Sequence, residues 1–159
     1  MRLIRIDIAE QRLTLLENEQ EMGRFACSTS VKGVGEMKGS EQTPRGWHRV
    51  RARIGEGMPL CSVFVGRRPT GEIWTPELAA RHEGRDWILT RILWLCGNEP
   101  GRNRRGDCDT MQRYIYIHGT PPTEPMGVPR SHGCIRLHDP ALLKVFAFAD
   151  VGCLVHICA

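Results

Sequence analysis

Short stretches in which apolar and polar residues alternate recur along the chain and predict β-strands. Such stretches, rich in β-branched and aromatic residues and bounded by Gly, Pro, Asn or Asp, are typical of half-buried strands. Their spacing of roughly ten residues favours a β-sandwich or a distorted barrel. The expected strands are residues 3–8, 12–17, 25–31, 47–52, 60–65, 87–96, 114–117 and 154–157, of which 87–96 is a strongly apolar run with the composition of a core strand.

Two segments change from this alternation to helical signals. Thr75 before Pro76 suits an N-cap followed by proline at the first helical position, and this helix should end by Gly84. Asp139 is the expected N-cap of a second helix over the apolar residues 141–149, with Gly152 ending it. We therefore expect a mainly β fold with two or three short helices, forming a single domain over residues 1–159.

Composition and charge narrow the class of protein only slightly. The chain has 41% hydrophobic and 25% charged residues, which is ordinary for a globular domain. No apolar run approaches the roughly 20 residues that cross a bilayer, so we expect no membrane partner. Charges at Arg2, Arg5 and Asp7 interrupt the pattern of a secretory leader. We expect a cytoplasmic protein, or a periplasmic one if a leader is absent from this chain.

The formal net charge of +4 suggests weak steering of anionic partners. A polar loop at residues 97–110 contains several arginines and is either a solvated surface loop or a loop that contacts anions. No aromatic residues interleave these arginines, as single-stranded nucleic-acid binding would favour. We therefore expect no nucleic-acid partner.

Seven cysteines are an odd number, so at least one thiol lies outside any intramolecular disulfide set. His118, His132, Cys134 and His138 could in principle ligate a metal, as could the residues Cys153, His156 and Cys158. The spacing of the second set is too tight at its second step for a zinc site, and on a strand its three members would not share a face. We expect no metal and no cofactor, and we interpret every cysteine except Cys134 as a small apolar residue.

The segment Ser131-His132-Gly133-Cys134 contains the parts needed for acyl transfer. A thiolate is a good nucleophile, and a neighbouring imidazole can generate it. Gly133 permits unusual backbone angles and close approach of a substrate. Backbone N–H groups around it could stabilise an oxyanion.

His118 is the candidate base, at the end of an expected strand and sixteen residues before Cys134. A proline-rich loop joins the two, and it is long enough to bring the side chains together. Spacing alone is weak evidence, because His118 could be structural and Cys134 could be a buried thiol.

Together these residues resemble the signature of the L,D-transpeptidase (YkuD-like) catalytic domain. That signature is a His, a gap of about a dozen residues, then Ser/Thr-His-Gly-Cys, an apolar residue and Asn or Arg; here it reads His118-Gly119 and then Ser131 to Arg136. The segments at 6–8, 11–13 and 17–18 are similar to the opening hairpin of that domain. Thr43-Pro44-Arg45-Gly46 is similar to its Thr-Pro-x-Gly turn, whereas residues 55–112 are less typical.

The resemblance implies a role for each site residue. Cys134 would attack the carbonyl of the diamino acid that precedes a terminal D-alanine in a peptidoglycan stem peptide, with His118 as base and the Gly119 carbonyl orienting its ring. The N–H groups of His132, Gly133 and Cys134 would hold the oxyanion, although His132 could instead brace the loop. Arg136 stands where many relatives have Asn; it could clamp a substrate carboxylate or form a surface salt bridge.

Three functions follow from this resemblance. The first is an L,D-carboxypeptidase that releases D-alanine from tetrapeptides, acting on soluble muropeptides during wall recycling. The second is an L,D-transpeptidase that joins stem peptides. The third is a muropeptide-binding module without activity. An upstream base disfavours papain-like amidases, whose histidine follows the cysteine.

Overall fold

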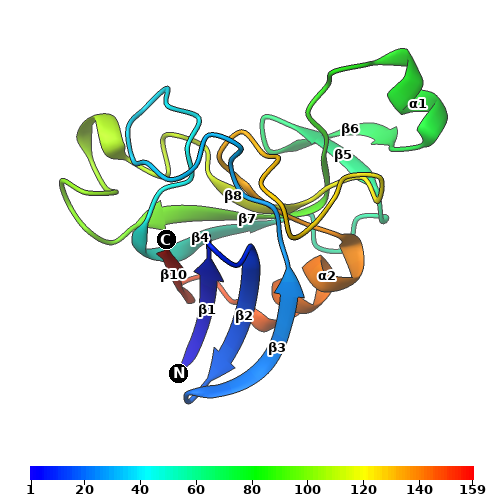
Figure 1. The fold of residues 1–159 in the computed structure, drawn as a ribbon. Helices are drawn as coiled ribbons and strands as arrows, with labels where there is room; N and C mark the ends of the chain where they lie inside the picture. The colour runs from blue at the N-terminus through cyan, green and yellow to red at the C-terminus, as the bar shows by residue number, and fades with distance from the viewer.

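The computed structural model describes all 159 residues, and its strands join into a single mixed sheet (Figure 1). Eight strands follow one another in the order β3-β2-β1-β10-β4-β7-β5-β6, while β8 pairs with β7 and β9 pairs with β8. The strands are β1 (Arg2–Asp7), β2 (Arg12–Glu17), β3 (Gln20–Ala26), β4 (Gly46–Ile54), β5 (Ser62–Val65), β6 (Arg68–Ile73), β7 (Ile88–Gly97), β8 (Tyr116–Gly119), β9 (Ile135–Leu137) and β10 (Leu154–Cys158).

The expected mainly β architecture is confirmed, with two α-helices, α1 (Pro76–Arg81) and α2 (Asp139–Phe148), and a short 3-10 helix at Gly106–Cys108. Thr75 caps α1 as predicted, since its hydroxyl accepts a hydrogen bond from the Leu78 N–H at 3.1 Å. The cap of α2 is one residue earlier than predicted: His138 is the N-cap and Asp139 begins the helix. This helix ends at Phe148, before Gly152, whose positive φ of 93° belongs to the turn into β10.

The strongly apolar run predicted the long buried strand β7, and the strands β1, β2, β4, β5 and β10 were predicted with small shifts at their ends. The strand predicted at residues 25–31 lies earlier, at Gln20–Ala26. The reason is that Asn18 and Glu19 alone form the preceding turn, at φ 49° and 70°. Residues 20 and 21 therefore already belong to β3. The chain from Cys27 onward leaves that hairpin and makes isolated bridges to the cysteine motif, Ser28 with Arg136 and Ser30 with Ser131.

Strand β8 begins at Tyr116 rather than at residue 114, since Tyr114 has a left-handed φ of 57° and cannot continue an extended strand. Strands β6 and β9 were not predicted. Pro69 and Gly71 interrupt the strand pattern of β6, and β9 has only three residues.

The main core lies between the curved sheet and α2, which packs beside β7 and β8 (Figure 1). Leu142, Val145 and Phe146 of α2 join strand residues such as Ile117 and Ile135 in this core. A separate small cluster of Val63, Trp74, Trp87 and Leu89 supports the β5–β6 hairpin and α1. The core thus fixes β8 and β9, the two strands that carry the predicted catalytic motif.

Candidate active site

Strands β8 and β9 lie side by side in parallel and bring the two predicted catalytic residues to one place. His118 aligns with Arg136, so Cys134, just before β9, is next to Tyr116. The Tyr116 N–H donates to the Cys134 sulfur at 3.3 Å, and the thiol donates to the Tyr114 carbonyl at 3.4 Å. Cys134 and His118 both line one cavity of about 430 Å³. Alternation along neighbouring strands therefore places thiol and imidazole on the same face.

The His118 ring is buried, with 1% of its surface exposed, and its orientation is fixed by its neighbour. Nδ1 lies 2.6 Å from the Gly119 carbonyl oxygen. Because a carbonyl only accepts, Nδ1 carries the proton and Nε2 has the free lone pair. Burial lowers the pKa of His118, opposed by the Asp86 carboxylate and the hydrogen bond to Gly119. The imidazole is therefore neutral near pH 7, as a general base must be.

The Cys134 thiol is only partly exposed at the surface of the cavity. Burial, together with the nearby Asp86 charge, raises the pKa of Cys134 to about 12. The Tyr116 N–H and the Arg136 and Arg113 guanidiniums act in the opposite direction. The resting pair is thus a neutral thiol and a neutral imidazole that line the same cavity, so the thiolate has to form during the reaction.

The loop before Cys134 is held by hydrogen bonds within the motif. The Ser131 hydroxyl donates to the Cys134 carbonyl at 2.6 Å and accepts from the Gly133 N–H at 3.2 Å. Gly133 has a φ of 132°, a conformation that L side chains rarely adopt, and a Cβ there would lie 3.3 Å from Ile115 Cδ1. The Gly133 N–H, one of three expected oxyanion donors, is therefore already hydrogen-bonded inside the loop. The N–H groups of His132 and Cys134 are the two expected donors that remain for an oxyanion.

The Thr-Pro-x-Gly turn braces this loop from the other side. The buried Thr43 hydroxyl donates to the Gly133 carbonyl at 2.9 Å and accepts from the Ser30 N–H at 3.0 Å. Next to it, the Arg113 guanidinium donates to the Gln42 carbonyl at 2.6 Å. Two sequence motifs that are ninety residues apart thus form one rigid support for the cysteine.

Arg136 is buried and lies between two carboxylates, rather than on the surface. Its Nη2 donates to Asp86 Oδ1 at 2.8 Å, and its Nη1 lies 3.6 Å from Glu124 Oε2. Its use as a substrate clamp stays a prediction, and two protein carboxylates already occupy the guanidinium. His132 is exposed, and its Nδ1 lies 3.6 Å from Asp86 Oδ2.

Asp86 is a site residue that the sequence did not indicate, because it lies in a polar turn fifty residues from Arg136. It lines the cavity with Cys134 and His118. Burial raises the pKa of this carboxyl, but the charges of His118, Arg136 and His132 and the hydrogen bond from Arg136 together hold it below its ordinary value. Asp86 is therefore ionised near pH 7, where it accepts from Arg136 and lies 3.6 Å from His132.

Arg67 is a second addition, at the tip of the β5–β6 hairpin. It lines the same cavity and donates to the Tyr116 hydroxyl at 3.0 Å. No carboxylate pairs with it; its guanidinium carbon instead lies 4.7 Å from the ring centre of Trp94 and 4.8 Å from that of Tyr114. A fixed and unpaired cation thus faces the cavity that contains Cys134.

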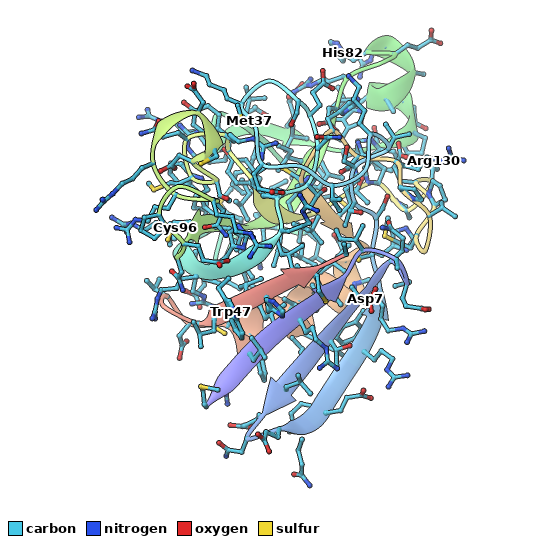
Figure 2. All side chains as sticks on the ribbon, turned by 60° about the vertical axis from the view of Figure 1, so that its left-hand side comes forward. Asp7, Met37, Trp47, His82, Cys96 and Arg130 are labelled. Atoms are coloured by element: carbon cyan, nitrogen blue, oxygen red, sulfur yellow. The ribbon has the colours of Figure 1, made fainter.

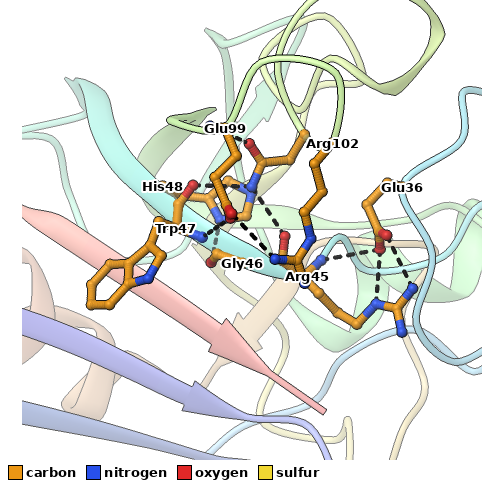
Figure 3. Close-up of polar contacts among 8 residues, drawn as sticks. Glu36, Arg45, Gly46, Trp47, His48, Glu99 and Arg102 are labelled. Carbon is orange, nitrogen blue, oxygen red and sulfur yellow. Dashed lines mark hydrogen bonds and ion pairs between the residues drawn. The ribbon is translucent and has the colours of Figure 1, made fainter.

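The arginine-containing loop at 97–110 is anchored at its base, as Figure 3 shows. Glu99 accepts from the Trp47 N–H at 2.8 Å and from Arg102 at 3.2 Å, and Arg45 pairs with Glu36 at 3.0 Å. Arg102 is therefore committed to an ion pair. Arg104 is not, and it lines a second groove.

No group of three or more His, Cys, Asp or Glu side chains is arranged to hold a metal ion. No helix of this structure has the length and hydrophobicity needed to cross a bilayer.

The fold and site together define a class: a β domain in which a cysteine and a histidine line one cavity and a backbone carbonyl fixes the tautomer of the histidine. Comparison with family models adds a match over residues 1–157 to YkuD, the L,D-transpeptidase catalytic domain. The chain therefore belongs to the L,D-transpeptidase catalytic domain family. No curated protein sequence matched.

Solved structures share this fold at low sequence identity. An L,D-transpeptidase from Mycobacterium smegmatis is 18% identical with a TM-score of 0.57, and 99% of this chain covers 58% of that one. L,D-transpeptidase 3 from Mycobacterium tuberculosis, in complex with a faropenem-derived adduct, is 14% identical with a TM-score of 0.61 and coverages of 99% and 60%. A cysteine-to-serine mutant of the Enterococcus faecium L,D-transpeptidase is 12% identical with a TM-score of 0.59 and coverages of 99% and 49%. The chain thus spans less than two thirds of the length of these structures.

Proposed function

We propose that this chain is a cysteine-dependent acyl-transfer enzyme acting on peptidoglycan stem peptides. The observation that carries the proposal is the shared cavity of Cys134 and His118, with the His118 tautomer fixed by Gly119. Membership of the L,D-transpeptidase family supplies the substrate class.

The geometry supports a mechanism in which the two neutral groups react together. His118 Nε2 takes the thiol proton as Cys134 Sγ attacks the carbonyl of the diamino acid. The N–H groups of His132 and Cys134 stabilise the oxyanion, a contribution worth about 10²–10³ in rate per donor in other enzymes. The C–N bond then breaks, His118 returns the proton to the leaving amine of the D-amino acid, and a thioester on Cys134 remains.

We propose further that water resolves this thioester, which makes the enzyme an L,D-carboxypeptidase that releases D-alanine from tetrapeptides. Arg67, a fixed guanidinium at the cavity with no carboxylate partner, would hold the tetrapeptide in place for either reaction. Such a group suits the free terminal carboxylate of a short substrate. Transfer to an amine of a second stem peptide is the alternative reaction.

Soluble muropeptides in the cytoplasm are the proposed substrate pool. All seven cysteines are free thiols in the structure, a state typical of proteins in reducing compartments. Cell fractionation with immunodetection tests this location, and a purely periplasmic signal would contradict it.

Incubation with a defined tetrapeptide, followed by mass spectrometry, distinguishes the reactions. We expect tripeptide and D-alanine from the wild type and no product from Cys134→Ala, because the nucleophile is missing. A peptide dimer instead of tripeptide would show transfer. Binding of tetrapeptide by both proteins without any product would favour the non-enzymatic muropeptide-binding module.

A β-lactam offers an independent test of the nucleophile. One structure with the same fold is described as a complex of an L,D-transpeptidase with imipenem. We expect imipenem to add its mass once to this chain, with the adduct located on Cys134 by peptide mapping. An adduct on the partly exposed Cys108 instead would argue against Cys134 as the activated thiol.

A further inference from the structure

A second groove, which we name the arginine groove, adjoins the cavity of Cys134. It has a volume of about 600 Å³ and lies between β4, β7 and the segment that follows β7. In Figure 2 the label of Cys96, one of its lining residues, marks its side of the molecule, opposite the label of Arg130. Four arginines from three parts of the chain line it: Arg49, Arg51, Arg67 and Arg104.

The β-strand pattern accounts for the first two of these arginines. Arg49 and Arg51 are two positions apart on β4, both exposed, while Val50 between them is buried. Their side chains therefore project from the same face of the sheet. Arg104 approaches from the loop after β7, and Arg67 from the tip of the β5–β6 hairpin.

The charge in this groove is not balanced by the protein. None of its four arginines forms an ion pair, although arginines elsewhere pair with Glu or Asp, as Arg85 does with Glu72 at 2.9 Å. The single carboxylate in the groove, Asp109, accepts hydrogen bonds from the N–H groups of Arg105 at 2.7 Å and Gln112 at 3.0 Å. Clustered like charges repel one another, so an arrangement of this kind favours an anionic ligand.

Part of the groove is already ordered for binding. The Tyr116 hydroxyl and the rings of Trp94 and Tyr114 fix the Arg67 guanidinium. Arg49 donates to the Gly152 carbonyl at 3.3 Å, which restrains a second guanidinium. A ligand therefore meets donors whose freedom has been reduced in advance, which lowers the entropic cost of binding.

We infer that the arginine groove binds the phosphate groups of a ligand. All four cations are arginine and none is lysine, and the planar guanidinium fork matches phosphate oxygens in pairs. A carboxylate has two oxygens and is satisfied by one fork, whereas a diphosphate presents enough oxygens for several forks at once. The inference does not depend on the proposed peptidase activity.

The groove also has a defined relation to the catalytic cavity, since Arg67 and Tyr114 line both. Tyr114 is 54% exposed, so one aromatic surface remains open to a ligand. A phosphate-bearing molecule in the groove would lie at the entrance to the Cys134 cavity. The phosphate could belong to free diphosphate or to a nucleotide, whose base would stack on Tyr114.

Isothermal titration of the full chain with pyrophosphate, in phosphate-free buffer of low ionic strength, tests the inference. We expect Arg51→Gln and Arg104→Gln each to weaken binding about tenfold or more, because each removes a charged fork. Arg68→Gln is the matched control: Arg68 is also exposed and unpaired but lies outside the groove, and its loss should leave the affinity unchanged.

Two further ligands complete the experiment. Uridine diphosphate binding more tightly than pyrophosphate would identify a nucleotide, and equal affinities would identify the phosphate groups alone; both support the inference. Citrate binding as tightly as pyrophosphate, no measurable pyrophosphate binding, or equal weakening by Arg68→Gln would overturn it. Cys134→Ala should bind pyrophosphate like the wild type, so failure of the proposed catalysis would not affect this result.

Discussion

At the scale of single residues, the site is governed by the balance of burial and charge around His118. Burial disfavours the imidazolium and lowers the pKa of His118, and the Asp86 carboxylate partly offsets this shift. Since His118 must be neutral to accept the thiol proton, the acid limb of activity reports its pKa. That limb should lie below the ordinary histidine value of about 6.5.

Replacing Asp86 by Asn should move this acid limb to still lower pH. The substitution removes the charge that raises the pKa of His118 and leaves Arg136, which lowers it. The measurement is kcat/KM for tetrapeptide hydrolysis across pH 4 to 8. Glu124→Gln is the control, because Glu124 also contacts Arg136 but does not perturb His118. An acid limb that moves to higher pH in Asp86→Asn would show that the Asp86 charge does not raise the pKa of His118.

The same residues show how far the sequence could predict the site. Cys134, His118 and Ser131 belong to one motif, and their proximity follows from two neighbouring strands. Asp86 precedes β7 and Arg67 is at the tip of the β5–β6 hairpin, and neither belongs to a sequence motif that predicts a site. Only the folded sheet brings these two residues to the cavity. The hydrogen bond from the Gly133 N–H to the Ser131 hydroxyl could not be predicted, because it depends on the position of the hydroxyl in the folded loop.

At the scale of elements, the cysteine loop has no regular structure of its own and depends on its neighbours for rigidity. The three-residue strand β9 holds one end of it, and the Thr43 hydroxyl holds the Gly133 carbonyl. A strand of three residues has too few alternating positions to be predicted, and its position is set by pairing with β8. The long apolar run of β7, in contrast, predicted that strand almost in full.

Replacing Thr43 by Val tests the brace while preserving shape. It leaves the Gly133 carbonyl and the Ser30 N–H without their buried partner, which should lower the free energy of unfolding by about 1–3 kcal/mol. Urea denaturation measures this change. Thr70→Val is the matched control on the exposed strand β6, where Thr70 bonds only to Glu72, and it should have little effect. Equal decreases in the free energy of unfolding for Thr43→Val and Thr70→Val would show that the Thr43 hydroxyl has no special role.

At the scale of the whole molecule, stability should depend on pH through buried neutral histidines. His48 is fully buried; its Nδ1 donates to the Gly46 carbonyl and its Nε2 accepts from the Thr110 hydroxyl, each at 3.0 Å. Burial lowers the pKa of His48 to about 4. The unfolded chain, with an ordinary histidine pKa near 6.5, binds more protons over this interval, so stability must fall as the pH falls from 6.5 towards 4.

His48→Gln should flatten that dependence. The wild type should lose about 3 kcal/mol between pH 6.5 and 4 through this group, whereas Gln does not titrate. Chemical denaturation at a series of pH values gives the slope of the free energy of unfolding against pH for the wild type and for His48→Gln. His82→Gln is the control, because His82 is exposed. Identical slopes for wild type and His48→Gln would show that His48 is not the titrating group.

The position of β10 has a consequence for how the protein is made. This last strand pairs in parallel with β1, the first, and antiparallel with β4, so it connects the hairpin at the start of the chain to the rest of the sheet (Figure 1). On the ribosome, β1, β2 and β3 emerge early but cannot join the sheet until residues 154–158 have left the exit tunnel. The apolar face of these three strands must stay exposed for that time, so the last residues of β10 set when the core can close.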